Sequence, residues 1–148
     1  MQPPSRSGSS GETQGADKDI LRKITILIGS PPSLARVIEH LFRGRAEFEI
    51  IGTLNNLGSL GQQAGRLLPD LIVANVKPVS IGIRRAVTSI KRSSPSSKLI
   101  LICPLEDLSR VAHESGADAY LKDEKLTSHL LRMARALSDR PTMANAGD

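Results

Sequence analysis

Short aliphatic runs alternate with longer stretches of helical period over most of the chain. Most of these runs are apolar at nearly every position, as a strand must be when helices cover both of its faces. We therefore predict five strands, at residues 24–28, 48–53, 71–76, 98–103 and 119–121. Strands that alternate with helices in this way are typical of an α/β protein with a parallel sheet.

Five predicted helices follow the strands, because apolar residues recur there at spacings of three and four. In the first helix these residues begin at Leu34, after Ser33 as the N-cap, and the helix stops at Gly44. The second helix, from Leu57, must end at Pro69, since proline cannot continue a helix. The others cover residues 83–90, 105–112 and 126–137. Right-handed crossovers place the helices on both faces of the sheet, in a three-layer sandwich whose strand order the pattern does not reveal.

The two ends of the chain lack this periodicity. Residues 1–19 and 141–148 consist mainly of small and polar residues with several glycines and prolines. Such segments cannot bury enough apolar surface to offset the entropy lost on ordering. We predict two disordered tails around a single folded domain at residues 20–140, and a length of 148 residues fits one domain.

The predicted domain is basic and poor in aromatic residues. The tails hold two of the 20 basic and four of the 15 acidic residues, which leaves the body with 18 against 11, a net charge of +7. Aromatic residues make up only 2% of the chain, which argues against a flavin site or an aromatic platform for RNA bases. A single cysteine excludes an intrachain disulfide and fits a cytoplasmic location. We expect no membrane span, because no apolar run reaches about 18 residues.

Five successive blocks of the chain carry a more specific signal: ILIGSPPSLARVIEHLF, FEIIGTLNN, PDLIVANV, KLILICP and GADAYLKD. Together they resemble the receiver domains of bacterial response regulators, the CheY-like family. The resemblance runs from about Lys23 to Leu137, and its more specific parts are PD before the third strand and GADAY at the fifth. It implies a flavodoxin-like fold with strand order 2-1-3-4-5 and a functional edge at the C-terminal ends of the strands.

Members of that family take a phosphoryl group onto an aspartate that ends the third strand, beside two Mg²⁺-binding acids, a Ser or Thr, and a Lys. The resemblance places Gly29 and Ser30 at the acid pair, Asn75 at the phosphoryl acceptor and Cys103 at the Ser or Thr. An amide cannot replace the carboxylate nucleophile, and Mg²⁺ prefers anionic oxygen. We therefore predict a degenerate pseudo-receiver that accepts no phosphoryl group, needs no metal or cofactor and is not an enzyme.

The match changes at the fifth strand. The family's lysine comes three residues after an aromatic residue, here Tyr120, but that position is Asp123 and the nearest lysine is Lys122. Whether Lys122 points into the pocket stays open, because a shift of one residue along a strand reverses the face. Tyr120 matches the aromatic switch of the family, although without phosphorylation an ordinary tyrosine at the edge of the core is the simpler interpretation.

Two groups of basic residues are candidate interaction surfaces. On the third helix, residues seven apart lie within about 20° of each other and form a basic strip, for which a solvated charged face is the simpler interpretation. The strip consists of Arg84, Arg85, Lys91 and Arg92. Family members commonly associate through the fourth helix, fifth strand and fifth helix. The basic residues of this second face are Arg110, Lys122, Lys125 and Arg132.

The functional hypothesis is an interaction or dimerisation module in bacterial signal transduction or transcriptional control that works without phosphorylation. Its partner would be another protein or a second copy. One alternative is a basic adaptor associated with nucleic acid, which is less favoured because aromatic residues are scarce and no recognition element is present. The other is a small-molecule binder that uses the emptied pocket. His40, His113 and His129 fall on separate predicted helices without the spacing of a metal or catalytic site.

Overall fold

The structure is a computed structural model that describes residues 22–55, 58–75, 83–103 and 116–138. These residues form a parallel sheet of five strands in the order β3-β2-β4-β5-β6. In chain order this is 2-1-3-4-5, so the predicted flavodoxin-like topology is confirmed. The strands are β2 (Ile24–Gly29), β3 (Phe48–Leu54), β4 (Leu71–Asn75), β5 (Lys98–Cys103) and β6 (Ala119–Lys122).

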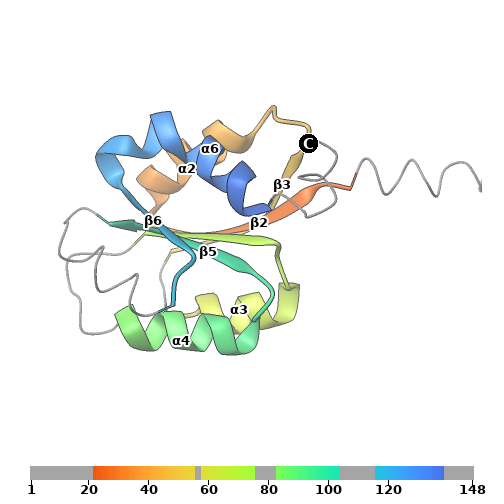
Figure 1. Ribbon diagram of the computed structural model, residues 1–148, viewed down its shortest axis with the longest axis vertical. Coiled ribbons are helices and arrows are strands. Elements are labelled where there is room, and N and C mark those ends of the chain that lie inside the picture. The colour runs from red at the N-terminus through yellow and green to blue at the C-terminus, as the bar shows by residue number, and fades with distance from the viewer. Residues whose placement is uncertain (1–21, 56–57, 76–82, 104–115, 139–148) are drawn as a thin grey trace, which may run out of the picture.

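Helices cover both faces of the sheet and give the predicted three layers (Figure 1). One layer holds α2 (Pro32–Phe42) and α6 (Leu126–Ser138), and the other holds α3 (Leu60–Leu67) and α4 (Ile83–Ser93). A short 3-10 helix, η1 (Asp123–Lys125), joins β6 to α6. The helix predicted at 105–112 and the tails at 1–19 and 141–148 lie outside the described residues.

Alternation along the strands divides the core into two apolar clusters. Ile28 of β2 and Val73 of β4 face α2 and α6, whereas Leu27 and Ile72 face α3 and α4. All four side chains are fully buried, and each contributes roughly 1.5–3 kcal/mol relative to an exposed position. Burial on both faces explains why the strands could be predicted from uninterrupted aliphatic runs.

Two helix starts differ from the sequence-based prediction. Pro31 is the N-cap of α2 and Pro32 opens the helix, so the predicted cap Ser33 lies inside the first turn. Proline is well suited to that position, because the N–H it lacks would have no intrahelical acceptor there. The second helix begins at Leu60, later than the predicted Leu57, which lies outside the described residues.

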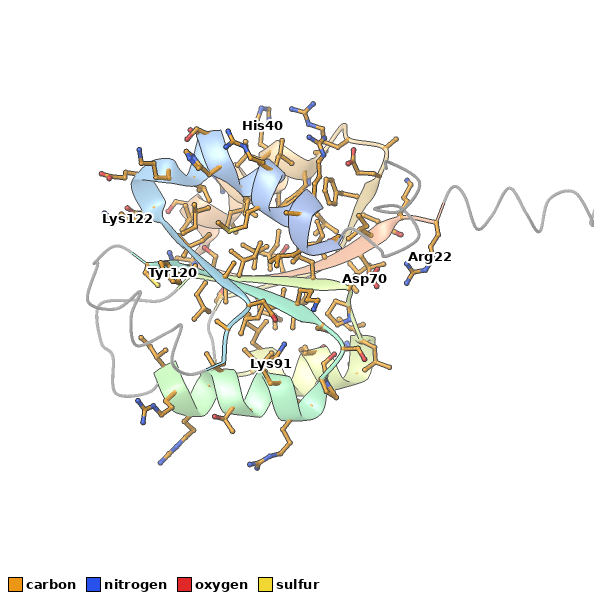
Figure 2. All side chains as sticks on the ribbon, in the orientation of Figure 1. Arg22, His40, Asp70, Lys91, Tyr120 and Lys122 are labelled. Atoms are coloured by element: carbon orange, nitrogen blue, oxygen red, sulfur yellow. The ribbon has the colours of Figure 1, made fainter. Side chains whose placement is uncertain are left out.

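The N-terminal edge of the sheet is held by Asp70, which immediately precedes β4. Its carboxylate accepts hydrogen bonds from the Thr25 backbone N–H at 2.9 Å and from the Thr25 hydroxyl at 3.1 Å. Arg22 adds an ion pair at 3.1 Å, and Figure 2 shows Arg22 and Asp70 together at this end of the molecule. Tyr120 and Lys122 lie at the opposite end (Figure 2), so the candidate functional edge is separate from this anchor.

Candidate functional site

The positions that the resemblance singled out lie at the C-terminal edge of the sheet. In the strand register, Gly29 pairs with Ala74, Asn75 with Ile102, and Cys103 with Lys122. Each of Gly29, Asn75, Cys103 and Lys122 is the last residue of its strand. The fold therefore brings these residues to one edge, as parallel strands require.

An apolar side chain occupies the space beside Gly29. A Cβ atom built on Gly29 would lie 2.8 Å from Leu60 Cδ2 and 3.2 Å from Leu60 Cδ1. Leu60 is fully buried in the cluster beneath α3 and α4, so it cannot easily move aside. A side chain larger than that of glycine therefore fits at position 29 only if the end of the Leu60 side chain shifts.

Ser30, which stands at the second acid position, is only 2% exposed. Its hydroxyl donates to the carbonyl oxygen of Pro31 at 3.2 Å, and its backbone N–H donates to the carbonyl oxygen of Leu54 at 2.7 Å. These bonds fix Ser30 in the turn between β2 and α2. A neutral hydroxyl in this position supplies no charge for a metal ion.

Asn75 and Cys103 face different layers. Asn75 is partly buried and, by alternation with Val73, lies on the side of α2 and α6. Cys103 is fully buried and belongs to the cluster on the side of α3 and α4, like the neighbours of Gly29. A buried thiol among aliphatic side chains behaves as a small hydrophobe. The candidate positions thus share an edge but divide between the two faces of the sheet.

Tyr120 and Lys122 fall on the same face of β6, because Leu121 between them packs on the other side. Tyr120 is 42% exposed, so it lies at the rim rather than in the core. Lys122 is half-buried and ends the strand. Figure 2 shows both residues at the C-terminal end of the sheet, on the side of the molecule opposite Asp70.

No metal site or membrane span is found within the described ranges. Groups of three or more His, Cys, Asp or Glu side chains that could hold a metal ion do not occur there. None of the helices in this part of the chain has the length and apolarity needed to cross a bilayer. A hollow of about 440 Å³ lies on the α2–β3 side, with Lys23, Arg43 and Arg45 in its lining, and contains none of the predicted pocket residues.

Lys91 does not belong to the exposed basic strip. Its ammonium group donates to Asp118 Oδ2 and to the carbonyl oxygen of Ser97, both at 2.9 Å. The same carboxylate oxygen accepts the backbone N–H of Leu99 at 2.7 Å. Lys91 therefore joins α4 to the start of β6, and Figure 2 shows it on the sheet side of α4. Arg84, Arg85 and Arg92 remain exposed.

The second basic face is described only in part. Lys125 in η1 and Arg132 in α6 are exposed, and Lys122 at the end of β6 is half-buried. Arg110 lies outside the described residues. Arg135, one turn further along α6, is bound to Glu47 at 2.7 Å. The hydrogen bond that Arg135 donates to the Glu47 carboxylate raises the pKa of the guanidinium, so this residue is already paired. Lys125 and Arg132 are therefore the residues of this face that are both described and exposed.

Sequence reasoning missed Leu60 and Asp118. A glycine at the end of a fully buried strand was the signal for Leu60, because such a glycine often marks the close approach of another group. The signal for Asp118 was its position before β6, where a carboxylate can accept N–H groups from the neighbouring strand. Neither signal identifies its partner without the fold.

The strand order and the arrangement of helices are those of response-regulator receiver domains. Solved structures similar to this chain include the signal receiver domain of NarL from Mycobacterium tuberculosis, with 15% identity, a TM-score of 0.68, and coverage of 78% of this chain and 96% of that one. The response regulator domain of CheB from Thermotoga maritima gives 17% identity, a TM-score of 0.68, and coverage of 80% and 98%. The CpaE2 pilus assembly protein from Sinorhizobium meliloti gives 12%, 0.62, and coverage of 77% and 99%. No family model and no curated protein matches the sequence.

Proposed function

We propose that this chain is a pseudo-receiver: a receiver-like module of signal transduction that acts through protein interaction and is not switched by phosphorylation. The observation that carries the proposal is the close approach of the Leu60 side chain to the position that a Cβ atom on Gly29 would take. A Cβ atom at position 29 would overlap the end of the Leu60 side chain, so an acidic side chain at this position would be disfavoured by packing as well as absent from the sequence.

The absence of acids at the other positions supports the same conclusion. Ser30 is neutral and bound to the turn, and Asn75 offers an amide where a carboxylate would be needed. Phosphoryl transfer in a receiver requires both a carboxylate nucleophile and a metal that neutralises charge on the transferred oxygens. Two independent requirements are unmet, so a single substitution should not restore the reaction.

Incubation with acetyl phosphate and Mg²⁺, followed by intact-mass spectrometry, tests the loss of phosphotransfer. We expect no phosphoryl adduct on the wild-type chain, and none on Asn75→Asp, because Gly29 and Ser30 still provide no acid. A response-regulator receiver with all three acids, treated in parallel, is the positive control. A wild-type adduct that mapped to the end of β4 would contradict the proposal.

Association through the face at Lys125 and Arg132 tests the interaction role. Basic side chains on this face should make self-association, or capture of an acidic partner, weaken with salt, since exposed charges are screened over about 10 Å at 0.1 M. Sedimentation equilibrium at two salt concentrations should show that Lys125→Glu/Arg132→Glu associates less than the wild type. Arg36→Glu/Arg45→Glu makes the same change in net charge elsewhere and is the matched control. Equal behaviour of the two double variants would rule this face out.

A further inference from the structure

The layer formed by α3 and α4 contains basic residues and no acidic ones. Residues 58–69 and 83–98 include no Asp or Glu, whereas the opposite layer carries acidic residues in α2 and η1. On this side of the sheet, Lys91 is bound to Asp118, and Arg66 is bound to the glutamine Gln63 at 2.6 Å. The basic residues of these two helices are Arg66, Arg84, Arg85, Lys91 and Arg92. The helices α3 and α4 therefore carry a net positive charge, and Arg85 and Arg92 are exposed.

The outer side of α4 presents its arginines away from the sheet. Ile83, Val87 and Ile90 are the buried residues of this helix. At 100° per residue, Arg85 and Arg92 lie opposite the centre of that buried stripe and within about 20° of each other. Figure 2 shows nitrogen-tipped side chains projecting from α4 on the side away from the sheet. Arg85 and Arg92 therefore lie on the outermost side of α4, away from the sheet.

Close packing makes α3 and α4 one continuous surface. A Cβ atom on Gly61 would lie 2.5 Å from the Ser89 hydroxyl, and one on Gly65 would lie 3.2 Å from Ser93 Cβ. Small residues on both helices thus allow a close approach along their length, and Figure 1 shows the two helices side by side beneath the sheet. The exposed residues around the arginines are hydroxyl or amide side chains. They are Gln62, Thr88, Ser89, Ser93 and Ser96.

This surface lacks the apolar centre of a protein interface. Within the described residues, the large hydrophobic side chains that are exposed are Val37, Leu68 and Tyr120, and none belongs to α4. Leu68 follows the end of α3 at the rim of the layer. Protein interfaces usually bury an apolar or aromatic core. Contacts to nucleic-acid phosphates instead come from Arg and Lys together with Ser, Thr and Gln side chains.

We propose that the α3–α4 surface binds the phosphate backbone of duplex nucleic acid. A duplex is favoured over a single strand because no aromatic side chain on this layer could stack on an exposed base. We expect sequence-independent binding, because contacts to phosphates carry no direct information on the bases. Its affinity rests on counterion release from a few phosphates and depends steeply on salt.

Fluorescence anisotropy with the full chain and labelled DNA and RNA duplexes of random sequence tests this surface. We expect a dissociation constant of about 10⁻⁶–10⁻⁴ M at physiological salt, with a slope of log K against log salt of about −0.9 for each phosphate contacted. Arg85→Gln/Arg92→Gln should reduce the magnitude of the slope by about 2 and weaken binding at low salt by about tenfold or more. Thermal melting of each variant verifies the fold.

Arg36→Gln/Arg45→Gln is the matched control, because it removes the same charge from the opposite layer. It should leave the slope unchanged and lower the affinity only slightly. Weaker binding of Arg85→Gln/Arg92→Gln to the DNA or the RNA duplex, with a smaller dependence on salt, supports the proposal. Equal losses in both double variants, no binding to either duplex at low salt, or equally tight binding to polyglutamate or to anionic vesicles would overturn it.

Discussion

Gly29 is a position where the addition of one methyl group should measurably lower stability. Alanine at 29 would bring a methyl group to 2.8, 3.2 and 3.5 Å from Leu60 Cδ2, Cδ1 and Cγ. Carbon atoms prefer separations of about 3.5–4.0 Å, so the methyl group overlaps the end of Leu60. The backbone of Gly29 is outside the positive-φ region, so the effect comes from this contact alone. We expect Gly29→Ala to lower the free energy of unfolding by about 1–3 kcal/mol, the usual cost of overpacking.

A double-mutant cycle isolates the contact. Leu60→Ala removes the obstructing atoms and should cost about 2–5 kcal/mol through the cavity it leaves. In Gly29→Ala/Leu60→Ala the new methyl group enters that cavity, so the double variant should be more stable than the sum of the single changes predicts, by about 1–2 kcal/mol. Urea denaturation followed by far-ultraviolet circular dichroism measures all four proteins. Additivity within about 0.5 kcal/mol would show that Leu60 does not occupy this space.

Restoring the acid gives an independent readout. Gly29→Asp adds the same overlap and also buries a carboxylate without a partner, which raises the pKa of that group above its unfolded value of about 3.9. Its folded state then binds more protons than its unfolded state, so stability falls as the pH rises through the interval between the two pKa values. The deficit of Gly29→Asp relative to Gly29→Ala should therefore be small below about pH 4 and larger at neutral pH. The argument that position 29 is buried and binds no metal would be refuted by either of two results. One is a difference in stability between the two variants that does not change with pH, and the other is a difference that Mg²⁺ removes.

Two further predictions concern the contacts that hold α4 and β5 in place. Lys91→Met should lower the free energy of unfolding by about 1–2 kcal/mol in urea denaturation, because it leaves the partly buried Asp118 carboxylate without its cation, whereas Arg92→Met should change it by less than about 0.5 kcal/mol. Equal effects of the two substitutions would contradict the pairing. Ser97→Ala should cost about 1–3 kcal/mol, since the buried Ser97 hydroxyl donates to the carbonyl oxygen of Pro69, and a neutral result in the same assay would exclude that bond.

The fold was largely predictable because the physical signal was strong and local. Strands buried on both faces are aliphatic throughout, and the run predicted at 98–103 coincides with β5 (Lys98–Cys103). Strand order depends on long-range packing, so it came from the resemblance to receiver domains and not from periodicity. The start of α2 was misplaced because a serine cap and a proline at the first turn compete for the same boundary, and Pro32 occupies it.

The candidate site was less predictable, since its properties depend on contacts between distant residues. Helical projection placed Lys91 in a strip with Arg84, but it could not show that Asp118, 27 residues further along, would draw the ammonium group inward. The missing acids could be read from the sequence. The position of the Leu60 side chain beside Gly29 could not be predicted, because nothing in the spacing of α3 specifies which side chain meets the end of β2.

The proposed α3–α4 surface and the Leu60 side chain beside Gly29 belong to the same helix layer. Leu60 opens α3 and packs against the end of β2, and α3 is in turn joined closely to α4 through Gly61 and Gly65. In a phosphorylated receiver the C-terminal edge changes with the state of its acceptor. If this chain accepts no phosphoryl group, as we propose, no such change would reach α3 and the arginines of α4. Duplex binding by α4 should therefore be insensitive to acetyl phosphate, whereas Leu60→Ala should weaken it by loosening α3. An anisotropy titration that changed on addition of acetyl phosphate with Mg²⁺ would contradict this expectation and the proposed loss of phosphorylation.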